Sequence, residues 1–126
     1  MNRLYNQFFL SLERGKAVLF GKVAIGATGA PTINAVKSKG IASVARTGAG
    51  AYTITLNDIY VDMYKCGVNF LFATSPGVAN VYVVSQDVAA AKTILIQCED
   101  FAGAAVDPAN GAEMQIELML KTSTAP

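Results

Sequence analysis

The chain has 126 residues, of which 52% are hydrophobic and 15% are charged, and its formal net charge is +1. This length predicts a single domain with one core, and the apolar content excludes an intrinsically disordered chain. The small net charge argues against a strongly charged partner, and we expect the charge-poor surface to be covered in part by partners or further copies of the chain.

The charges are distributed unevenly along the chain. Residues 1–46 contain seven basic residues and one acidic residue, whereas residues 47–126 contain three basic and eight acidic residues. Such opposite potentials orient subunits that meet head to tail, and they also neutralise each other when both halves share one fold. Both interpretations are open from the sequence. The basic half lacks a dense cluster of Lys and Arg, so we expect no nucleic-acid partner.

The first predicted element is a short helix over residues 2–14. Leu4, Phe8 and Leu12 are spaced four residues apart, which places them on one helical face, and Gly15 is a typical stop. This segment is the most aromatic part of the chain. It either packs on its own domain or acts as an arm that docks on a neighbour.

Strand-like runs follow, separated by turn residues. The first occupies 17–25, a turn-rich segment covers 27–40, and two further runs at 41–46 and 51–56 flank a glycine-containing turn at 47–50. A strand, a glycine turn and a strand of alternating apolar residues and threonines predict a β-hairpin.

The second half of the chain also consists of strand-like runs separated by turns and loops. A turn begins the run at 57–67, and residues 99–113 form a long loop rich in Gly, Ala, Asp and Pro. Seven or eight short strands in total are typical of an all-β sandwich or barrel, in which two sheets bury one face each. We therefore expect a β-sandwich domain over 16–126, preceded by a helix or arm over 1–15. The remaining strand-like runs lie at 68–74, 78–85, 92–98 and 114–121.

Catalytic chemistry has little support in the residue types. The chain contains no His, which excludes serine and cysteine triads that use a histidine base. Two cysteines without histidine do not complete a tetrahedral zinc site. Gly21-Lys22 is followed by Val23, so the phosphate-loop pattern is absent. We expect no catalytic residues, no metal, no cofactor and no enzymatic activity.

Carboxylates and aromatic residues leave two alternatives each. Two groups of carboxylates are candidate calcium ligands: Asp58 with Asp62, and Glu99 with Asp100 and Asp107. The alternative is that they are solvated loop acids, and neither group has the spacing of a calcium-binding loop. The strand aromatics form either a stacking platform or core and interface packing, and the lack of interleaved Lys and Arg favours packing. These aromatics are Tyr52, Tyr60, Tyr64, Phe70, Phe72 and Tyr82.

The two cysteines, Cys66 and Cys98, lie in apolar strand-like runs, which favours buried free thiols over a disulfide. We see no targeting segment, and no apolar run reaches the roughly 18 residues of a membrane span. The sequence thus predicts a protein that is made in a cytoplasm and kept there or built into an assembly.

Three stretches of the sequence resemble small virion proteins of tailed bacteriophages. They are GKVAIGATGAPTI (21–33), GIASVARTGAGAYTITLNDIY (40–60) and DPANGAEMQIELMLKTSTAP (107–126). The resemblance covers about residues 20–125 and consists of the strand and turn patterns of β-hairpins. It does not include the predicted N-terminal helix. It implies a mainly β, jelly-roll-like antiparallel sandwich, often a trimer, that serves as a capsid decoration protein or as a component of a head or tail fibre.

From this resemblance and the composition we expect a capsid decoration (cement) protein that bridges coat subunits on the virion surface and is assembled in the host cytoplasm. Its expected partners are the major capsid protein and itself, as a homotrimer, with no nucleic acid and no membrane. The alternatives are a fibre or spike component and a carbohydrate- or receptor-binding module. The residues expected to contact a partner are Arg3, Leu4, Tyr5, Phe8, Phe9, Leu12 and Arg14.

Overall fold

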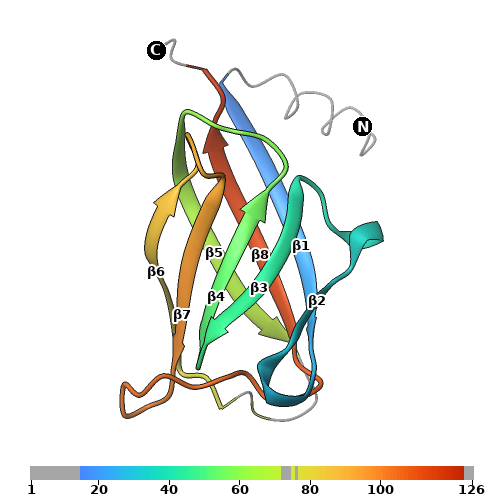
Figure 1. Cartoon of the computed structure of the whole chain (residues 1–126), viewed down its shortest axis with the longest axis vertical. Helices are drawn as coiled ribbons and strands as arrows, with labels where there is room; N and C mark the ends of the chain where they lie inside the picture. Colours follow the sequence, from blue (N-terminus) through green and yellow to red (C-terminus); the bar gives the residue numbers. More distant parts are fainter. Residues whose placement is uncertain (1–14, 72–74, 76, 124–126) are drawn as a thin grey trace, which may run out of the picture.

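The computed structural model describes residues 15–71, 75 and 77–123. In this part of the chain, the strands form two four-stranded antiparallel sheets (Figure 1). Sheet A has the order β2-β1-β8-β5, and sheet B has the order β3-β4-β7-β6. The elements are β1 (Lys16–Ile25), η1 (Ala27–Gly29), β2 (Pro31–Ile33), η2 (Ala35–Lys37), β3 (Ile41–Gly48), β4 (Ala51–Leu56), β5 (Asp62–Leu71), β6 (Asn80–Asp87), β7 (Thr93–Glu99) and β8 (Glu113–Lys121).

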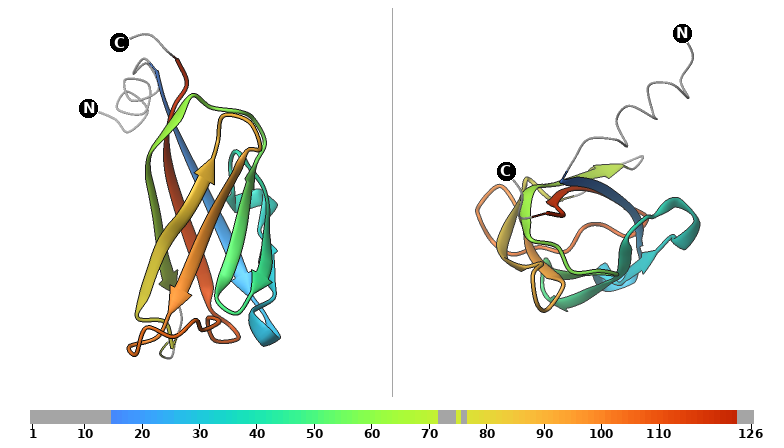
Figure 2. Two further views of the ribbon diagram at one scale, coloured as in Figure 1. Left: turned by 60° about the vertical axis from the view of Figure 1, so that its left-hand side comes forward. Right: turned by 90° about the horizontal axis from the view of Figure 1, so that it is seen from above.

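The two sheets face each other, as Figure 2 shows in the view along the strands, and the hydrophobic core lies between them. Successive side chains of a strand point to opposite faces, so alternating apolar residues fill the space between the sheets. On β8 these residues are Met114, Ile116, Leu118 and Leu120, none of them more than 3% exposed. The mainly β fold with two packed sheets is thereby confirmed.

Strands with clear alternation lie where the sequence predicts them. β4 covers the predicted 51–56, and it pairs with β3 as the predicted antiparallel hairpin. β8 extends the predicted 114–121 by one residue. Period-two patterns of this kind are strong signals because one face must be buried and the other solvated.

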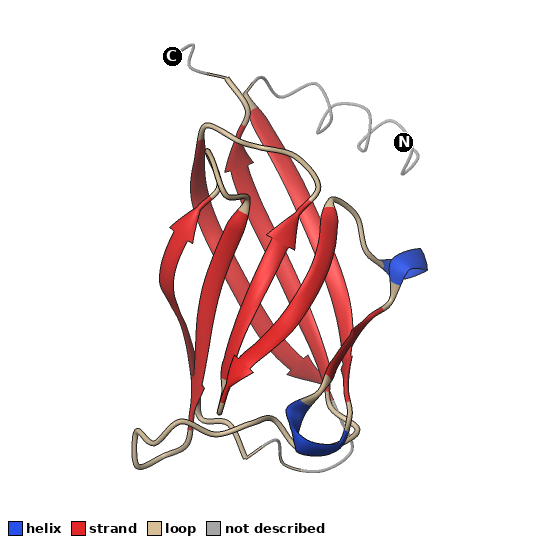
Figure 3. Cartoon of the chain, in the orientation of Figure 1, coloured by secondary structure: helices blue, strands red, loops and turns tan. Residues whose placement is uncertain are grey.

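The structure divides two parts of the chain differently from the prediction. The runs predicted at 57–67 and 68–74 are joined in the single strand β5, which continues through Gly67. Gly67 pairs with Glu117 on the outward face of sheet A, where no side chain is needed for the core. Within the turn-rich 27–40, the structure contains the short edge strand β2, flanked by the two 3-10 turns (Figure 3).

Strands far apart in the chain meet at the centre of each sheet. β1 pairs with β8 over nine residues, and β4 pairs with β7. This brings the loop between β7 and β8 to the same end of the sandwich as η1 and the β3–β4 turn (Figure 1). The loops at that end bring Arg46, Gly50 and Asp107 together.

Candidate interaction surfaces

The residues predicted to contact a partner lie in the first 14 positions, outside the part of the chain that the structure describes. Their role stays a prediction. Candidate surfaces within the described residues are the loop ends and the outer faces of the sheets. The predicted partner-contact residues outside the described part are Arg3, Leu4, Tyr5, Phe8, Phe9, Leu12 and Arg14.

One end of the sandwich is closed by a cluster of Arg46, Gly50 and Asp107, here called the loop latch. Asp107 Oδ1 accepts hydrogen bonds from Arg46 Nε at 2.9 Å and from the Gly50 amide at 2.8 Å. Asp107 Oδ2 accepts from Arg46 Nη2 at 2.8 Å. Bidentate, charge-assisted contacts of this kind are among the stronger hydrogen bonds in proteins. The latch therefore ties the β7–β8 loop to the β3–β4 hairpin.

The loop latch fixes the charge state of its members. Hydrogen bonding to Arg46 holds the pKa of Asp107 below the usual carboxyl value, and the Gly50 amide acts in the same direction. The same pairing raises the pKa of Arg46. Lys22 Nζ also lies 3.7 Å from Glu113 Oε1. Both ion pairs join the basic half of the sequence to the acidic half, which favours neutralisation within one fold.

A buried hydroxyl completes this end of the molecule. Tyr52, which is inaccessible to solvent, donates from its hydroxyl to the carbonyl of Gly29 at 2.8 Å. Burial raises the pKa of Tyr52 well above its ordinary value, so the hydroxyl stays a donor. Gly29 has φ +74°, and a Cβ there would lie 2.7 Å from Asp107 Cγ. All these polar groups are used to close the end of the sandwich.

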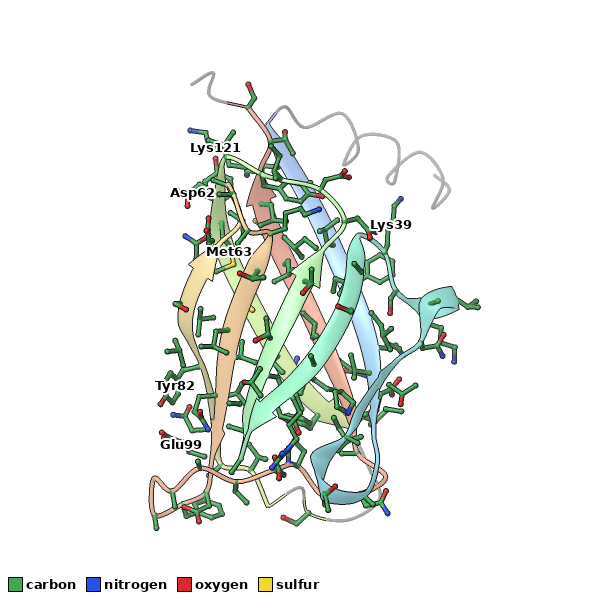
Figure 4. All side chains as sticks on the ribbon, viewed as in Figure 1. Lys39, Asp62, Met63, Tyr82, Glu99 and Lys121 are labelled. Atoms are coloured by element: carbon green, nitrogen blue, oxygen red, sulfur yellow. The ribbon has the colours of Figure 1, made fainter. Side chains whose placement is uncertain are left out.

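The carboxylates considered for calcium have separate roles. Glu99 Oε1 accepts from the Tyr82 hydroxyl at 2.9 Å on the neighbouring strand (Figure 4), and Asp107 belongs to the loop latch. Asp62 accepts from the backbone amide of Met63 at the opposite end of the molecule. Among the residues that the structure describes, no group of three or more His, Cys, Asp or Glu side chains is placed to hold a metal ion.

The side chain of Phe101 is 98% exposed, and it lies on a turn fixed by hydrogen bonds. Asp100 Oδ1 accepts from the amides of Ala102 and Ala104 at 2.8 and 3.0 Å. The Asp100 amide donates to the Ala104 carbonyl, and the Gly103 amide donates to the Asp100 carbonyl. An aromatic side chain on a turn with a fixed backbone is a typical interface anchor, because the backbone loses little conformational entropy when it binds.

Val36 repeats this arrangement on the edge of the molecule. It is 95% exposed in η2, and Asn34 Oδ1 accepts from the amides of Val36 and Lys37, both at 3.1 Å. These apolar tips lie in the segments predicted as turns (27–40) and as a polar loop (99–113), and neither tip was predicted. The available signal was a single large apolar residue shortly after an Asn or Asp that caps a turn.

The aromatic residues of the strands do not share one surface. Tyr52 is buried, Tyr64 on sheet A and Tyr82 on sheet B are 53% and 42% exposed, and Phe72 lies outside the described residues. Phe70 borders a groove of about 310 Å³ between β5 and the start of β6. The structure thus favours packing over a common stacking platform. The groove is lined by Val68, Asn69, Phe70, Val78, Ala79, Asn80 and Val81.

Both cysteines are free thiols, half-buried at Cys66 and buried at Cys98, and burial raises the pKa of each thiol to about 11. At pH 8 only about one thiol in a thousand is then ionised, and the thiolate is the reactive form. We expect negligible alkylation by iodoacetamide in the native protein at pH 8 and complete alkylation of both residues in urea, measured by mass spectrometry. Rapid labelling of either cysteine in the native state would contradict this arrangement.

Comparison of the chain with models of known protein families, with curated protein sequences and with solved structures found no match. The resemblance to phage virion proteins therefore stays a prediction based on the residues of 21–33, 40–60 and 107–126. The part of the chain that the structure describes contains no helix with the length and apolar character of a transmembrane span.

Proposed function

We propose that this chain is a virion structural protein, a capsid decoration (cement) protein that acts as a homotrimer and bridges coat subunits on the phage head. The three phage-like stretches of the sequence support this proposal. The low share of charged residues supports it as well, since an assembled particle covers apolar surface that a free monomer exposes.

The observation that carries the proposal is the apolar tip at Phe101. A nearly fully exposed phenylalanine on a hydrogen-bonded turn has no function in the core of its own domain. It suits an anchor that inserts into a pocket of a partner, where aromatic residues contribute much of the binding energy. Many copies with modest contacts then stabilise a shell through the sum of their interfaces.

Two finer points of the fold belong to this proposal. The pairing of the first strand with the last, and of β4 with β7, supports a rolled-up, jelly-roll-like sandwich. The spacing of Leu4, Phe8 and Leu12 supports a helix ahead of the sandwich.

The proposal is tested with phage particles assembled without this chain. We expect them to release their DNA at a lower temperature than complete particles, measured with a DNA-binding dye during heating, and to regain stability when the purified protein is added. Complete particles should contain hundreds of copies, which quantitative mass spectrometry measures. Unchanged release temperature, or absence of the chain from purified particles, would overturn the proposal. A few copies per particle would indicate a fibre or spike instead.

The tip itself is tested by Phe101→Ser, which removes the ring and leaves the turn. We expect affinity for particles that lack the chain to fall about tenfold or more, as for a buried aromatic anchor. Ala102→Ser, on the same turn, is the matched control and should bind normally. Equal binding by both variants would exclude Phe101 as the anchor. Binding to glycans that is lost when exposed Tyr64 or Tyr82 is changed would instead favour a carbohydrate-binding module.

A further inference from the structure

The outer face of sheet A carries large apolar side chains that the described part of the chain covers only in part. Val18 and Phe20 of β1 are 54% and 49% exposed. Met119 of β8 pairs directly with Val18, and its side chain is partly exposed. Gly67 of β5 lies one row further along, opposite Glu117, and adds no side chain of its own. Together Val18, Phe20 and Met119 form what we call the β1–β8 patch.

We propose that residues 1–14 of the same chain cover the β1–β8 patch. They join β1 through Gly15, whose φ of +73° is a turn conformation. The Gly15 carbonyl accepts a hydrogen bond of 2.9 Å from the Thr122 amide, just beyond β8. The segment therefore starts from a fixed point on sheet A, and Val18 lies three residues from that point.

The length and pattern of the segment fit this face. As a helix, 14 residues span about 21 Å, less than the roughly 33 Å of a ten-residue strand. The predicted stripe of Leu4, Phe8 and Leu12 supplies the apolar side that a sheet face requires. Val84 on sheet B is also exposed, at 52%, but the segment is not attached to that sheet.

Covalent attachment favours the segment of the same chain over that of a second copy. A segment tethered three residues from its site has an effective concentration in the millimolar range, far above typical working concentrations. Of the two interpretations of residues 1–14, this selects packing on the chain's own domain. The exposed side chains of Phe101 and Val36 are then the candidates for contact with a neighbouring protein, in place of residues 1–14. The inference does not depend on the proposed virion role.

Oxidation of Met119 by hydrogen peroxide, followed by peptide mass spectrometry, tests the inference. In the full chain, the sulfur of Met119 should be oxidised about fivefold more slowly than in a chain that begins at Gly15, because oxidation follows exposure. Phe8→Ser in the full chain should also expose Met119, whereas Gln7→Ser, next to it but off the predicted stripe, should not. Met114, which is fully buried, should stay protected in every variant and so reports that the sandwich is folded.

The protection of Met119 should be unchanged by an about hundredfold dilution of the protein, since contacts within one chain do not depend on concentration. Protection that disappears on dilution would overturn the inference in favour of a second copy. Equal oxidation of Met119 in the full and the shortened chain, with Met114 protected in both, would show that residues 1–14 do not cover the patch.

Discussion

Replacing Gly50 by alanine is expected to lower the free energy of unfolding by about 4 kcal/mol, a large part of the stability of a domain this size. Gly50 is buried and has φ +66°, which disfavours any side chain. An added Cβ would lie 2.5 Å from the Cys98 carbonyl oxygen and 2.6 Å from that of Val106. Both are backbone atoms, so the β3–β4 turn or the β7–β8 loop must move.

The movement would also break the loop latch, because the Gly50 amide donates to Asp107 and the Gly50 carbonyl accepts from the Cys98 amide. Thermal unfolding followed by circular dichroism should show a midpoint lower by roughly 15 °C.

Gly111→Ala is the matched control for this substitution. Gly111 has φ +91°, so alanine is strained there too, but its Cβ would meet nothing within 4 Å. We expect a loss of about 1 kcal/mol from backbone strain alone. Similar losses for the two variants would show that the close approach of the backbone at Gly50 does not matter.

The contrast between local and distant signals explains what the sequence could predict. β4 and β8 were predicted nearly to the residue, because a strand with one buried face shows apolar and polar residues in alternation along the sequence. The fold class followed from the number of such strands. β2 has three residues, too few to show a period, and Gly67 in the middle of β5 suggested a break where the outer face needs no side chain.

The candidate surfaces were harder to predict, for two different reasons. Arg46 and Asp107 are 61 positions apart and meet only because β4 pairs with β7 and the loop after β7 returns across the end of the sandwich. No local pattern contains that pairing. Phe101, in contrast, was predictable in part, since an aspartate followed by a lone large apolar residue and a glycine is a turn that displays the residue between them.

The loop latch gives the second large effect. Asp107→Ala is expected to cost about 2 kcal/mol at pH 7, because it removes three hydrogen bonds and leaves the Gly50 amide without its acceptor. Asp107→Asn keeps an acceptor oxygen without the charge and should cost about half as much. Since Asp107 is only partly buried, solvent screening limits both values. Urea denaturation at pH 7 measures them.

The effect should depend on pH in a defined direction. The pKa of Asp107 is lower in the folded protein than its ordinary value of 3.8. The charged form is therefore favoured by folding, so its contribution is complete above about pH 4 and is lost as the pH falls through the folded-state pKa. The stability difference between the native sequence and Asp107→Asn should be constant near neutral pH and shrink below pH 4.

Glu113→Gln separates the loop latch from ordinary surface charge. Glu113 faces Lys22 across a single 3.7 Å contact between side chains that are 31% and 39% exposed, a geometry that contributes little to stability. We expect a change below about 0.5 kcal/mol. If Glu113→Gln and Asp107→Asn destabilised the protein equally, or if the difference for Asp107→Asn grew in acid, the carboxylate of Asp107 would not be what holds the β7–β8 loop against the β3–β4 hairpin. The position of the β7–β8 loop, which carries Phe101, would then be set by apolar packing and not by the hydrogen bonds of Asp107.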